Sequence, residues 1–171
     1  TPTAMDTPPL LVRDIMTQDV VTFSKDVSLE QAWGVMATRH FHAVPIISQD
    51  RKIVGIISES DFLTKGQLHL HLPSFIDVLK KSYIPWDIPY GQKELMEKVL
   101  LSRVEDIMTI ECLTVRADMP LREAIAFFTE NHLKTIPVTD EAGTLVGIVT
   151  ISDIMQRILE SSTTSLLKKP V

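Results

Sequence analysis

The sequence has little of what extracellular and membrane proteins depend on. Among 171 residues there is one cysteine, Cys112, so no internal disulfide can form, and no CxxC or Cys/His zinc spacing is present. No apolar run approaches the roughly 20 residues that span a bilayer. The first ten residues lack the basic and apolar regions of a signal peptide. We therefore expect a cytoplasmic protein without membrane insertion.

An excess of basic residues is also missing. The chain has 17 Lys and Arg against 22 Asp and Glu, a formal net charge of −5, and these charges are scattered instead of grouped in blocks. This balance argues against nucleic acid or an anionic membrane as a partner. With 44% hydrophobic and 23% charged residues, the composition is that of a globular chain with one or two small domains.

Sequence patterns of catalysis are absent too. There is no Gly-rich phosphate loop and no ordered catalytic triad, so we expect that the protein is not an enzyme and has no catalytic residue. His69 and His71 could share a metal ion, but with no nearby Cys or acidic residue an exposed loop is favoured, and no metal site is predicted. Cys112 aligns with Val20 in the repeat described next, which favours a buried strand residue over a nucleophile.

An internal repeat is the strongest feature of the sequence. VRDIMT at 12–17 returns as VEDIMT at 104–109, and VGIISESDFL at 54–63 returns as VGIVTISDIM at 146–155, both at an offset of 92. Over the ungapped alignment of 12–63 with 104–155, 16 of 52 positions are identical. Chance would give about 3. The chain therefore contains two copies of one structural unit.

Each copy has the pattern strand, helix, strand, strand, helix. The predicted strands are 20–23, 43–47 and 53–57 in the first copy and 112–115, 135–139 and 145–149 in the second. Apolar residues at helical spacing follow the first strand of each copy: Leu29, Ala32, Trp33 and Met36, then Leu121, Ala124, Ile125 and Phe128. We expect Asp26 and Asp118 at the N-caps of these helices.

The last helix of each copy is predicted to begin at Ser58 or Thr150. Ser58-x-x-Asp61 and Thr150-x-x-Asp153 both have the form of a capping box. His40 and His132 end the first helices, where a cation suits the helix dipole, so a C-terminal capping role is favoured for them.

The predicted fold is of the α/β (α+β) class, with two pseudo-symmetric β-α-β-β-α repeats packed as one module. We predict repeat 1 at 10–63, an insert at 64–103 and repeat 2 at 104–160. The insert has helical patterns at 74–81 and 92–101 around the segment YIPWDIPY. This aromatic segment could be a partner-binding patch or could fold back over the module, and the sequence leaves both open.

The repeat resembles the CBS (cystathionine-beta-synthase) domain, whose tandem arrangement is called the Bateman module. The resemblance rests on DIMT (14–17 and 106–109), on the strands around Pro45 and Pro137, and on the VGI-x-(S/T)-x-S-D endings (54–61 and 146–153). It implies a flat homodimer of modules and a regulatory, non-catalytic role. It also implies adenosine-containing ligands bound in two clefts between the repeats, with no obligatory cofactor.

The ligand class that the resemblance implies suggests a role for each repeated residue. An ionised aspartate can accept both hydroxyl groups of a ribose, which makes Asp61 and Asp153 the candidate ribose ligands. Ser58 and Thr150, at helix N-termini, with Ser60 and Ser152 beside them, suit the phosphate side. Each Ser/Thr–Asp pair could instead be a capping box alone, but the family context favours ligand contact.

The remaining candidate residues are also implied by the resemblance. His42 and Lys134 are candidate phosphate contacts. One predicted cleft combines Met16, Val21, His42 and Ala43 with Thr150 and Asp153; the other combines Met108, Leu113, Lys134 and Thr135 with Ser58 and Asp61. Ala43 and Thr135 stand where nucleotide-binding members carry an arginine, which argues against tight polyphosphate binding and leaves a monophosphate or an uncharged adenosyl tail open. DIMT can serve instead as a structural entry turn, with Ile15 and Ile107 in the core and Asp14 and Asp106 bonding locally.

Two functions follow as hypotheses. The first is a regulatory module that binds an adenosine-containing nucleotide of the AMP, ATP or S-adenosylmethionine class and signals to an unidentified partner protein. The second is a structural or interaction scaffold with degenerate clefts that acts through dimerisation and the aromatic insert. Substitution of Asp61 and Asp153 separates them.

Overall fold

The computed structural model describes residues 9–64 and 101–167. The predicted insert, including the YIPWDIPY segment, His69 and His71, lies outside these residues except at its two ends. Its helical and aromatic character therefore stays a prediction, as do the boundaries 10–63, 64–103 and 104–160.

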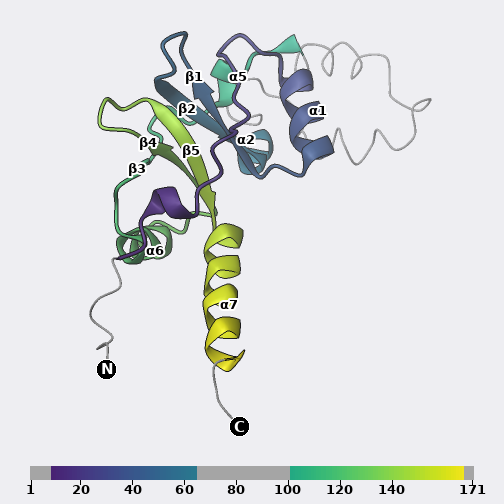
Figure 1. Ribbon diagram of the computed structural model, residues 1–171. Helices are drawn as coiled ribbons and strands as arrows, with labels where there is room; N and C mark the ends of the chain where they lie inside the picture. Colours follow the sequence, from purple (N-terminus) through teal and green to yellow (C-terminus); the bar gives the residue numbers. More distant parts are fainter. Residues whose placement is uncertain (1–8, 65–100, 168–171) are drawn as a thin grey trace, which may run out of the picture. The chain divides into compact units, whose positions relative to one another are not determined.

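Two antiparallel hairpins carry the predicted repeat (Figure 1). Strands β1 (Ala43–Ile47) and β2 (Ile53–Ser58) form one, and β4 (Thr135–Thr139) and β5 (Leu145–Thr150) form the other. The two registers match, with Pro45 opposite Ile56 and Pro137 opposite Ile148. The sequence-predicted hairpins are confirmed, and each second strand continues one residue further than predicted.

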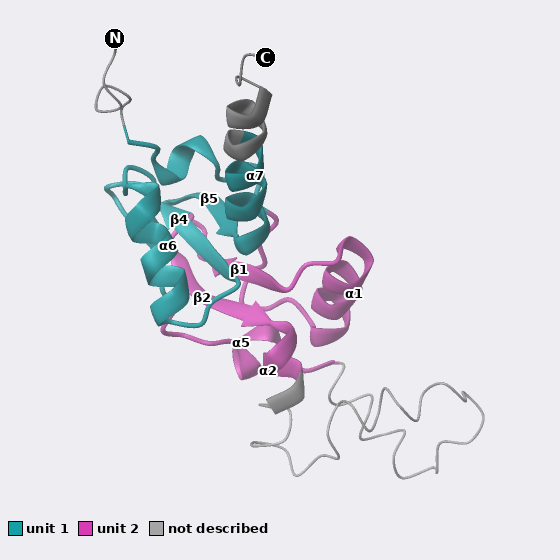
Figure 2. Cartoon of the chain, turned by 90° about the horizontal axis from the view of Figure 1, so that it is seen from below, with its two compact units in different colours: residues 1–20, 113–171 teal, residues 21–112 magenta. Residues whose placement is uncertain are grey.

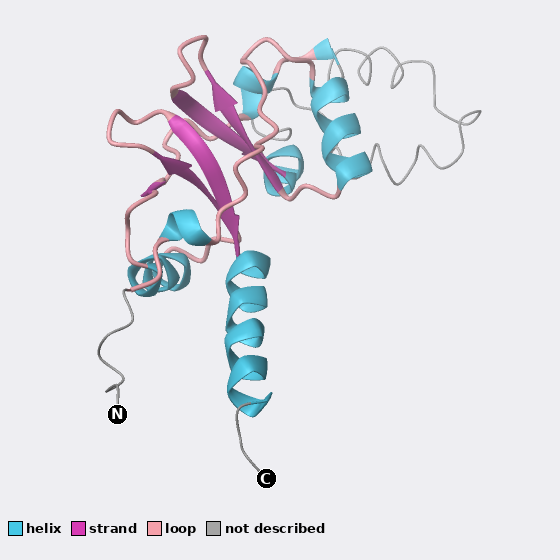
Figure 3. Ribbon diagram, viewed as in Figure 1, coloured by secondary structure: helices cyan, strands magenta, loops and turns pink. Residues whose placement is uncertain are grey.

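Helices stand before and after each hairpin, as the repeat predicts (Figure 3). The four longer helices are α1 (Leu29–Arg39), α2 (Glu59–Thr64), α6 (Leu121–Glu130) and α7 (Ile151–Leu167). The described residues also form two short helices, η1 (Val12–Asp14) and α5 (Val104–Ile107), and a short strand, β3 (Val115–Arg116). The α/β class is thereby confirmed. Within the described ranges, no helix is long and apolar enough to cross a membrane.

The first strand of each repeat is shorter than predicted. In 20–23 only Phe23 pairs, in a parallel bridge to Ile46, and in the second repeat β3 begins at Val115 and runs parallel to β4. The interpretation of Cys112 as a buried strand residue is wrong. Its N–H donates to Ile110 O at 2.9 Å in a bend before β3, and the side chain is half-buried.

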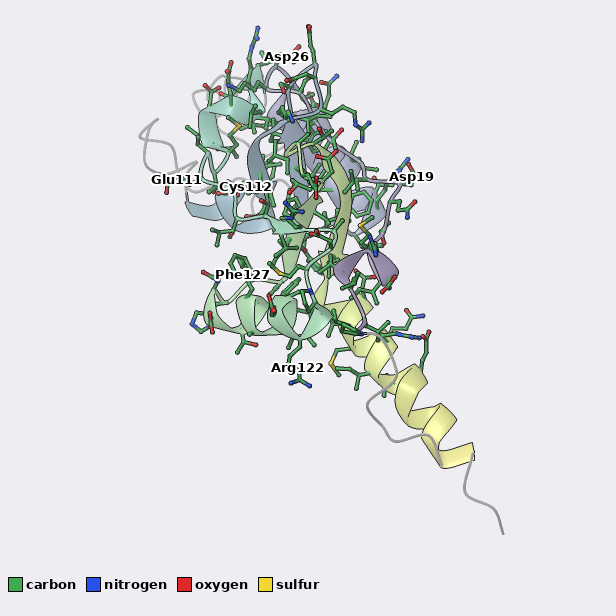
Figure 4. The ribbon with its side chains drawn as sticks, turned by 60° about the vertical axis from the view of Figure 1, so that its left-hand side comes forward. Asp19, Asp26, Glu111, Cys112, Arg122 and Phe127 are labelled. Carbon is green, nitrogen blue, oxygen red and sulfur yellow. The ribbon has the colours of Figure 1, made fainter. Side chains whose placement is uncertain are left out.

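The predicted N-caps are also wrong. Helix α1 is capped by Ser28, whose Oγ accepts from Gln31 N–H at 3.2 Å, while Asp26 is exposed on the preceding turn (Figure 4). Asp118 instead accepts two hydrogen bonds from Arg116, at 2.8 and 2.7 Å, and Pro120 takes the N-cap position of α6. A Ser followed three residues later by Gln can bond reciprocally, and this capping box outcompetes the more distant acid.

The two predicted repeats exchange their entry segments, by which we mean the DIMT residues 14–17 and 106–109. The chain divides into two compact units, residues 1–20 with 113–171 and residues 21–112 (Figure 2). In the first unit Thr17 and Ile148 exchange backbone hydrogen bonds, each 2.9 Å. In the second unit Thr109 and Ile56 do the same, at 2.8 and 2.9 Å. Each DIMT segment therefore extends the hairpin of the other repeat.

Each unit has its own apolar core. In unit 21–112 the buried side of α1 lies against the hairpin and the entry segment. The rings of Trp33 and Phe62 pack edge to face, with their centroids 5.1 Å apart. In the other unit α6 buries Leu121, Ala124 and Phe128 of its predicted apolar stripe, and Ile125 is partly buried. On the same helix Arg122 is exposed and Phe127 half-buried (Figure 4). The helical spacing of apolar residues therefore predicted the correct faces.

Candidate functional site

The repeated Ser/Thr-x-x-Asp motifs lie at the same place in the two units, where the second strand of the hairpin ends and the next helix begins (Figure 1). We call the group around Ser58 and Asp61 the Asp61 cluster, and the group around Thr150 and Asp153 the Asp153 cluster. The chain turns sharply from strand to helix at both points, which places the fourth residue of the motif against the first.

In the Asp61 cluster every carboxylate oxygen is engaged. Asp61 Oδ2 accepts from Ser58 N–H at 2.7 Å and from Ser58 Oγ at 2.6 Å, and Asp61 Oδ1 accepts from Thr109 Oγ1 at 3.2 Å. Ser60 Oγ lies 2.8 Å from Ser58 Oγ. Asp61 is only 5% exposed. The group holds the entry segment of the second repeat onto the first.

In the Asp153 cluster one carboxylate oxygen is engaged in the same way. Asp153 Oδ2 accepts from Thr150 N–H and from Thr150 Oγ1, both at 2.7 Å, and Asp153 N–H donates to Thr150 Oγ1 at 3.3 Å. The residue is half-buried. Among the described residues no hydrogen bond reaches Asp153 Oδ1. The capping contact predicted for both motifs is therefore present, and here one oxygen remains open to a ligand.

The entry segments contact the hairpins through the repeated glycines. A Cβ on Gly55 would lie 2.9 Å from both Met108 Sδ and Thr109 O, and a Cβ on Gly147 would lie 2.5 Å from Met16 Sδ and 3.1 Å from Thr17 O. At Gly55 one of the close atoms is a backbone oxygen, so a side chain there would force the entry segment to move, whereas at Gly147 the closest atom belongs to the flexible Met16 side chain. The structure therefore places Met16 in the same unit as Asp153, and Met108 in the same unit as Asp61.

The basic candidates stand beside these clusters in different surroundings. His42 Nδ1 lies 3.0 Å from Glu59 Oε2, and both side chains are exposed, at 65% and 52%. At the matching positions of the other unit are Lys134, which is exposed, and Ile151, which is 44% exposed. The backbone is the same in both places, since Glu59 N–H donates to His42 O and Ile151 N–H to Lys134 O, each at 3.1 Å.

The other predicted base-pocket residues lie near one cluster or the other. Ala43 pairs with Ser58 across the hairpin, and Thr135 pairs with Thr150. Val21 is half-buried and Leu113 is 45% exposed. The predicted grouping, with Val21, His42 and Ala43 on the side of Asp153 and Leu113, Lys134 and Thr135 on the side of Asp61, combines residues of both units and stays a prediction. Ser152 is exposed next to Asp153.

Three residues of the clusters, Thr109, Glu59 and Ile151, were not predicted from the sequence. Thr109 belongs to the repeated DIMT motif, so the signal for it was present, but its contact with Asp61 depends on the exchange of entry segments. Glu59 and Ile151 occupy equivalent positions, but one is acidic and the other apolar. Glu59 therefore faces His42 with a carboxylate, and Ile151 provides no such group for Lys134.

The DIMT segments have the local structure expected of an entry turn. Asp14 Oδ2 accepts from Leu11 N–H, and Asp106 Oδ2 accepts from Arg103 N–H, each at 2.8 Å. Ile107 is 5% exposed, and Ile15 packs partly buried against the core of its unit. His40 ends α1 with a φ of 56°, and His132 has a φ of 52° just after α6. Both therefore end their helices in the left-handed conformation.

Two chemical features of the described residues bear on catalysis and metal binding. Burial raises the pKa of the Cys112 thiol to about 11, which opposes a nucleophilic role. In the ranges 9–64 and 101–167 no group of three or more His, Cys, Asp or Glu residues could hold a metal ion.

Comparison with known proteins gives a consistent family. The model of the CBS domain matches residues 12–67 and 104–160. An uncharacterised protein of Methanocaldococcus jannaschii, MJ1426, is 30% identical over 158 residues, which cover 88% of this chain and 92% of that protein.

Two solved structures share the fold. CBSX2 of Arabidopsis thaliana in complex with AMP superimposes with a TM-score of 0.65 at 23% identity, covering 88% of this chain and 97% of that one. The CBS domain pair of protein MJ0100, in complex with 5-methylthioadenosine and S-adenosyl-L-methionine, gives 0.63 at 23% identity, covering 90% and 99%.

Proposed function

Because the chain belongs to the CBS domain family, we propose that it is a regulatory module that binds an adenosine-containing ligand and signals its presence to a partner protein. Pairs of CBS domains are regulatory, non-catalytic modules in general. The identity of the ligand and the signalling to a partner are the parts proposed here.

The observation that carries this proposal is that only one of the two carboxylate oxygens of Asp153 accepts hydrogen bonds from the described residues. Its Oδ2 is fixed by Thr150 N–H and Oγ1, while Oδ1 receives no hydrogen bond from the described residues. A ribose presents two adjacent hydroxyl donors, and an ionised carboxylate held in one orientation is a suitable acceptor for them. The capping contacts therefore position the aspartate without saturating it.

The ligand class is supported by related structures. CBSX2 was solved with AMP, and the MJ0100 domain pair with 5-methylthioadenosine and S-adenosyl-L-methionine. These ligands share adenosine and differ in their 5′ group. Ala43 and Thr135 offer no cation beside the strand prolines, which favours a ligand with at most one phosphate over ADP or ATP.

The exchanged entry segments provide a route for the signal. Met16 lies against Gly147, three residues before Thr150, so a ligand at the Asp153 cluster adjoins a segment of the first repeat. A ligand that prefers one arrangement of this segment shifts the population of the module toward that arrangement. A homodimer of modules, a cytoplasmic location and an unidentified regulated protein complete the proposal.

A scaffold function is the second candidate. It is favoured by the Asp61 cluster, in which both carboxylate oxygens are already occupied and the side chain is 5% exposed. If both clusters only fix the entry segments, the chain acts by protein contacts alone.

A thermal-shift series separates the two functions. The purified chain is melted with AMP, ADP, ATP, S-adenosylmethionine, 5-methylthioadenosine and NAD. A ligand at 100 times its dissociation constant adds about 2.7 kcal/mol. This corresponds to a shift of roughly 5–10 °C for a chain of this size. A shift with an adenosyl compound that is lost in Asp153→Asn supports the sensor, and no shift with any of them contradicts it.

A further inference from the structure

We propose that the two clusters are not equivalent: the Asp153 cluster is the ligand site and selects an adenosine ligand with an anionic 5′ group, a monophosphate, while the Asp61 cluster is structural. This inference rests on the proposed function, because it assigns that function to one of two duplicated motifs. The observations behind it are a difference in carboxylate availability and a difference in charge.

The first difference is the second carboxylate oxygen. Thr109 Oγ1 donates to Asp61 Oδ1 at 3.2 Å and leaves the residue 5% exposed. Asp153 is half-buried, and its Oδ1 has no such donor among the described residues. To reach Asp61, a ribose would have to displace Thr109 and desolvate a hydrogen-bonded carboxylate, whereas at Asp153 it would only replace solvent.

The second difference is the charge beside each carboxylate. His42 faces Glu59 at 3.0 Å, so this pair carries no net positive charge whether the imidazole is protonated or not. Lys134 occupies the position of His42 in the other unit, with Ile151 in place of Glu59. Among the described residues no acid pairs with Lys134. Its ammonium is therefore available to an anion.

These two differences act on different parts of one ligand. The open oxygen of Asp153 suits the ribose hydroxyls. Lys134, which the sequence-based prediction grouped with Asp61, belongs to the same unit as Asp153, and its ammonium suits a phosphate on the 5′ carbon. At the Asp61 cluster the carboxylate of Glu59 repels a phosphate. Of the two clusters, the Asp153 cluster is therefore the favourable position for a nucleoside monophosphate.

The structure offers a matched pair of substitutions at equivalent positions. Ile151→Glu places a carboxylate beside Lys134, as Glu59 stands beside His42. Ile151 is 44% exposed at the start of α7, where an acid suits the helix dipole, so folding should be retained. Glu59→Gln removes the charge at the other cluster and is the control.

Isothermal titration of the full chain with AMP and with 5-methylthioadenosine tests the inference. The two compounds share adenine and ribose and differ in the charge of the 5′ group. We expect one AMP per chain. Ile151→Glu and Lys134→Gln should each lower the affinity for AMP by about tenfold. The affinity for 5-methylthioadenosine should change by less than about threefold in both variants. Glu59→Gln should leave AMP affinity unchanged.

Each other outcome has a definite meaning. Three results would overturn the inference and leave the proposed function standing. They are binding of two AMP molecules per chain, loss of AMP binding in Asp61→Asn with retention in Asp153→Asn, and an equal loss of affinity for both compounds in Ile151→Glu. If the wild-type chain binds neither compound, the proposed function fails with it. Far-ultraviolet circular dichroism confirms folding of Asp153→Asn, and the exposed Lys134→Gln gives the same test without altering the capping contact.

Discussion

Thr17 and Ile148 exchange both of their backbone hydrogen bonds, at 2.9 Å each, although they belong to different repeats. Thr109 and Ile56 repeat this pairing in the other unit. The DIMT segment of each repeat thus pairs with the second strand of the other repeat's hairpin. The repeats consequently depend on each other for their sheets, and a disturbance at one entry segment should destabilise the unit that receives it.

Substitution of Gly55 should show how tightly an entry segment is held. A Cβ at this position would lie 2.9 Å from Thr109 O, a backbone atom fixed by its pairing with Ile56. Gly55→Ala should therefore lower the free energy of unfolding by about 1–3 kcal/mol, measured by urea denaturation.

Gly34 is the matched control for this experiment. It lies within α1, and a Cβ added there would meet nothing within 4 Å, so Gly34→Ala should raise the stability by about 0.5–1 kcal/mol through its helix propensity. If both variants have the same stability, the close approach of the entry segment is not as described.

The two repeated aspartates should differ in their effect on stability. Asp61→Ala removes a buried carboxylate that accepts from the part-buried hydroxyls of Ser58 and Thr109, and should cost about 2–4 kcal/mol. Asp153→Ala loses contacts with Thr150 only, at a half-buried position, and should cost about 1–2 kcal/mol. Thermal melts of both variants without ligand give the comparison, and a larger loss for Asp153 would argue against a structural role for Asp61.

The N-cap of α1 can be tested directly. Ser28→Ala removes the acceptor for Gln31 N–H and should lower the stability by about 0.5–2 kcal/mol. Asp26→Ala, two residues earlier on an exposed turn, should have a smaller effect. Chemical denaturation of the two variants decides between them, and the reverse order would restore Asp26 as the cap.

Cys112 should be a slow nucleophile in the folded chain. Burial raises the pKa of its thiol to about 11, from an ordinary value of 9.0, and only the thiolate reacts. At pH 8 its alkylation by iodoacetamide should be roughly a hundredfold slower than in the urea-unfolded chain, since the thiolate fraction falls by that factor. The rate should rise with pH up to about 11. Equal rates in the folded and unfolded chain would show that the thiol is not shielded.

Local sequence patterns predicted most of the fold. Short apolar runs joined by a polar turn predicted both hairpins, and the register of each is set within a short stretch of chain. The capping contacts at Asp61 and Asp153 followed from a spacing of three residues. The N-cap prediction for α1 was wrong because Ser28 and Asp26 are both good capping residues, and only the geometry of the turn selects one.

The remaining features depend on distant contacts. The bridge from Thr17 to Ile148 joins segments that no periodicity links, and the entry segments are too short to show a strand pattern. The difference between Asp61 and Asp153 arises from Thr109, whose hydroxyl reaches one carboxylate through tertiary packing. Two motifs with the same Ser/Thr-x-x-Asp pattern therefore form sites of different exposure.

A crystal structure of the chain grown with saturating AMP tests the central claim most directly. The account predicts one nucleotide per chain, with its ribose hydroxyls within hydrogen-bond distance of Asp153 Oδ1 and its phosphate beside Lys134, and with Thr109 still bonded to Asp61. A nucleotide whose ribose lies on Asp61, or crystals without nucleotide when AMP is supplied in large excess over the chain, would contradict it.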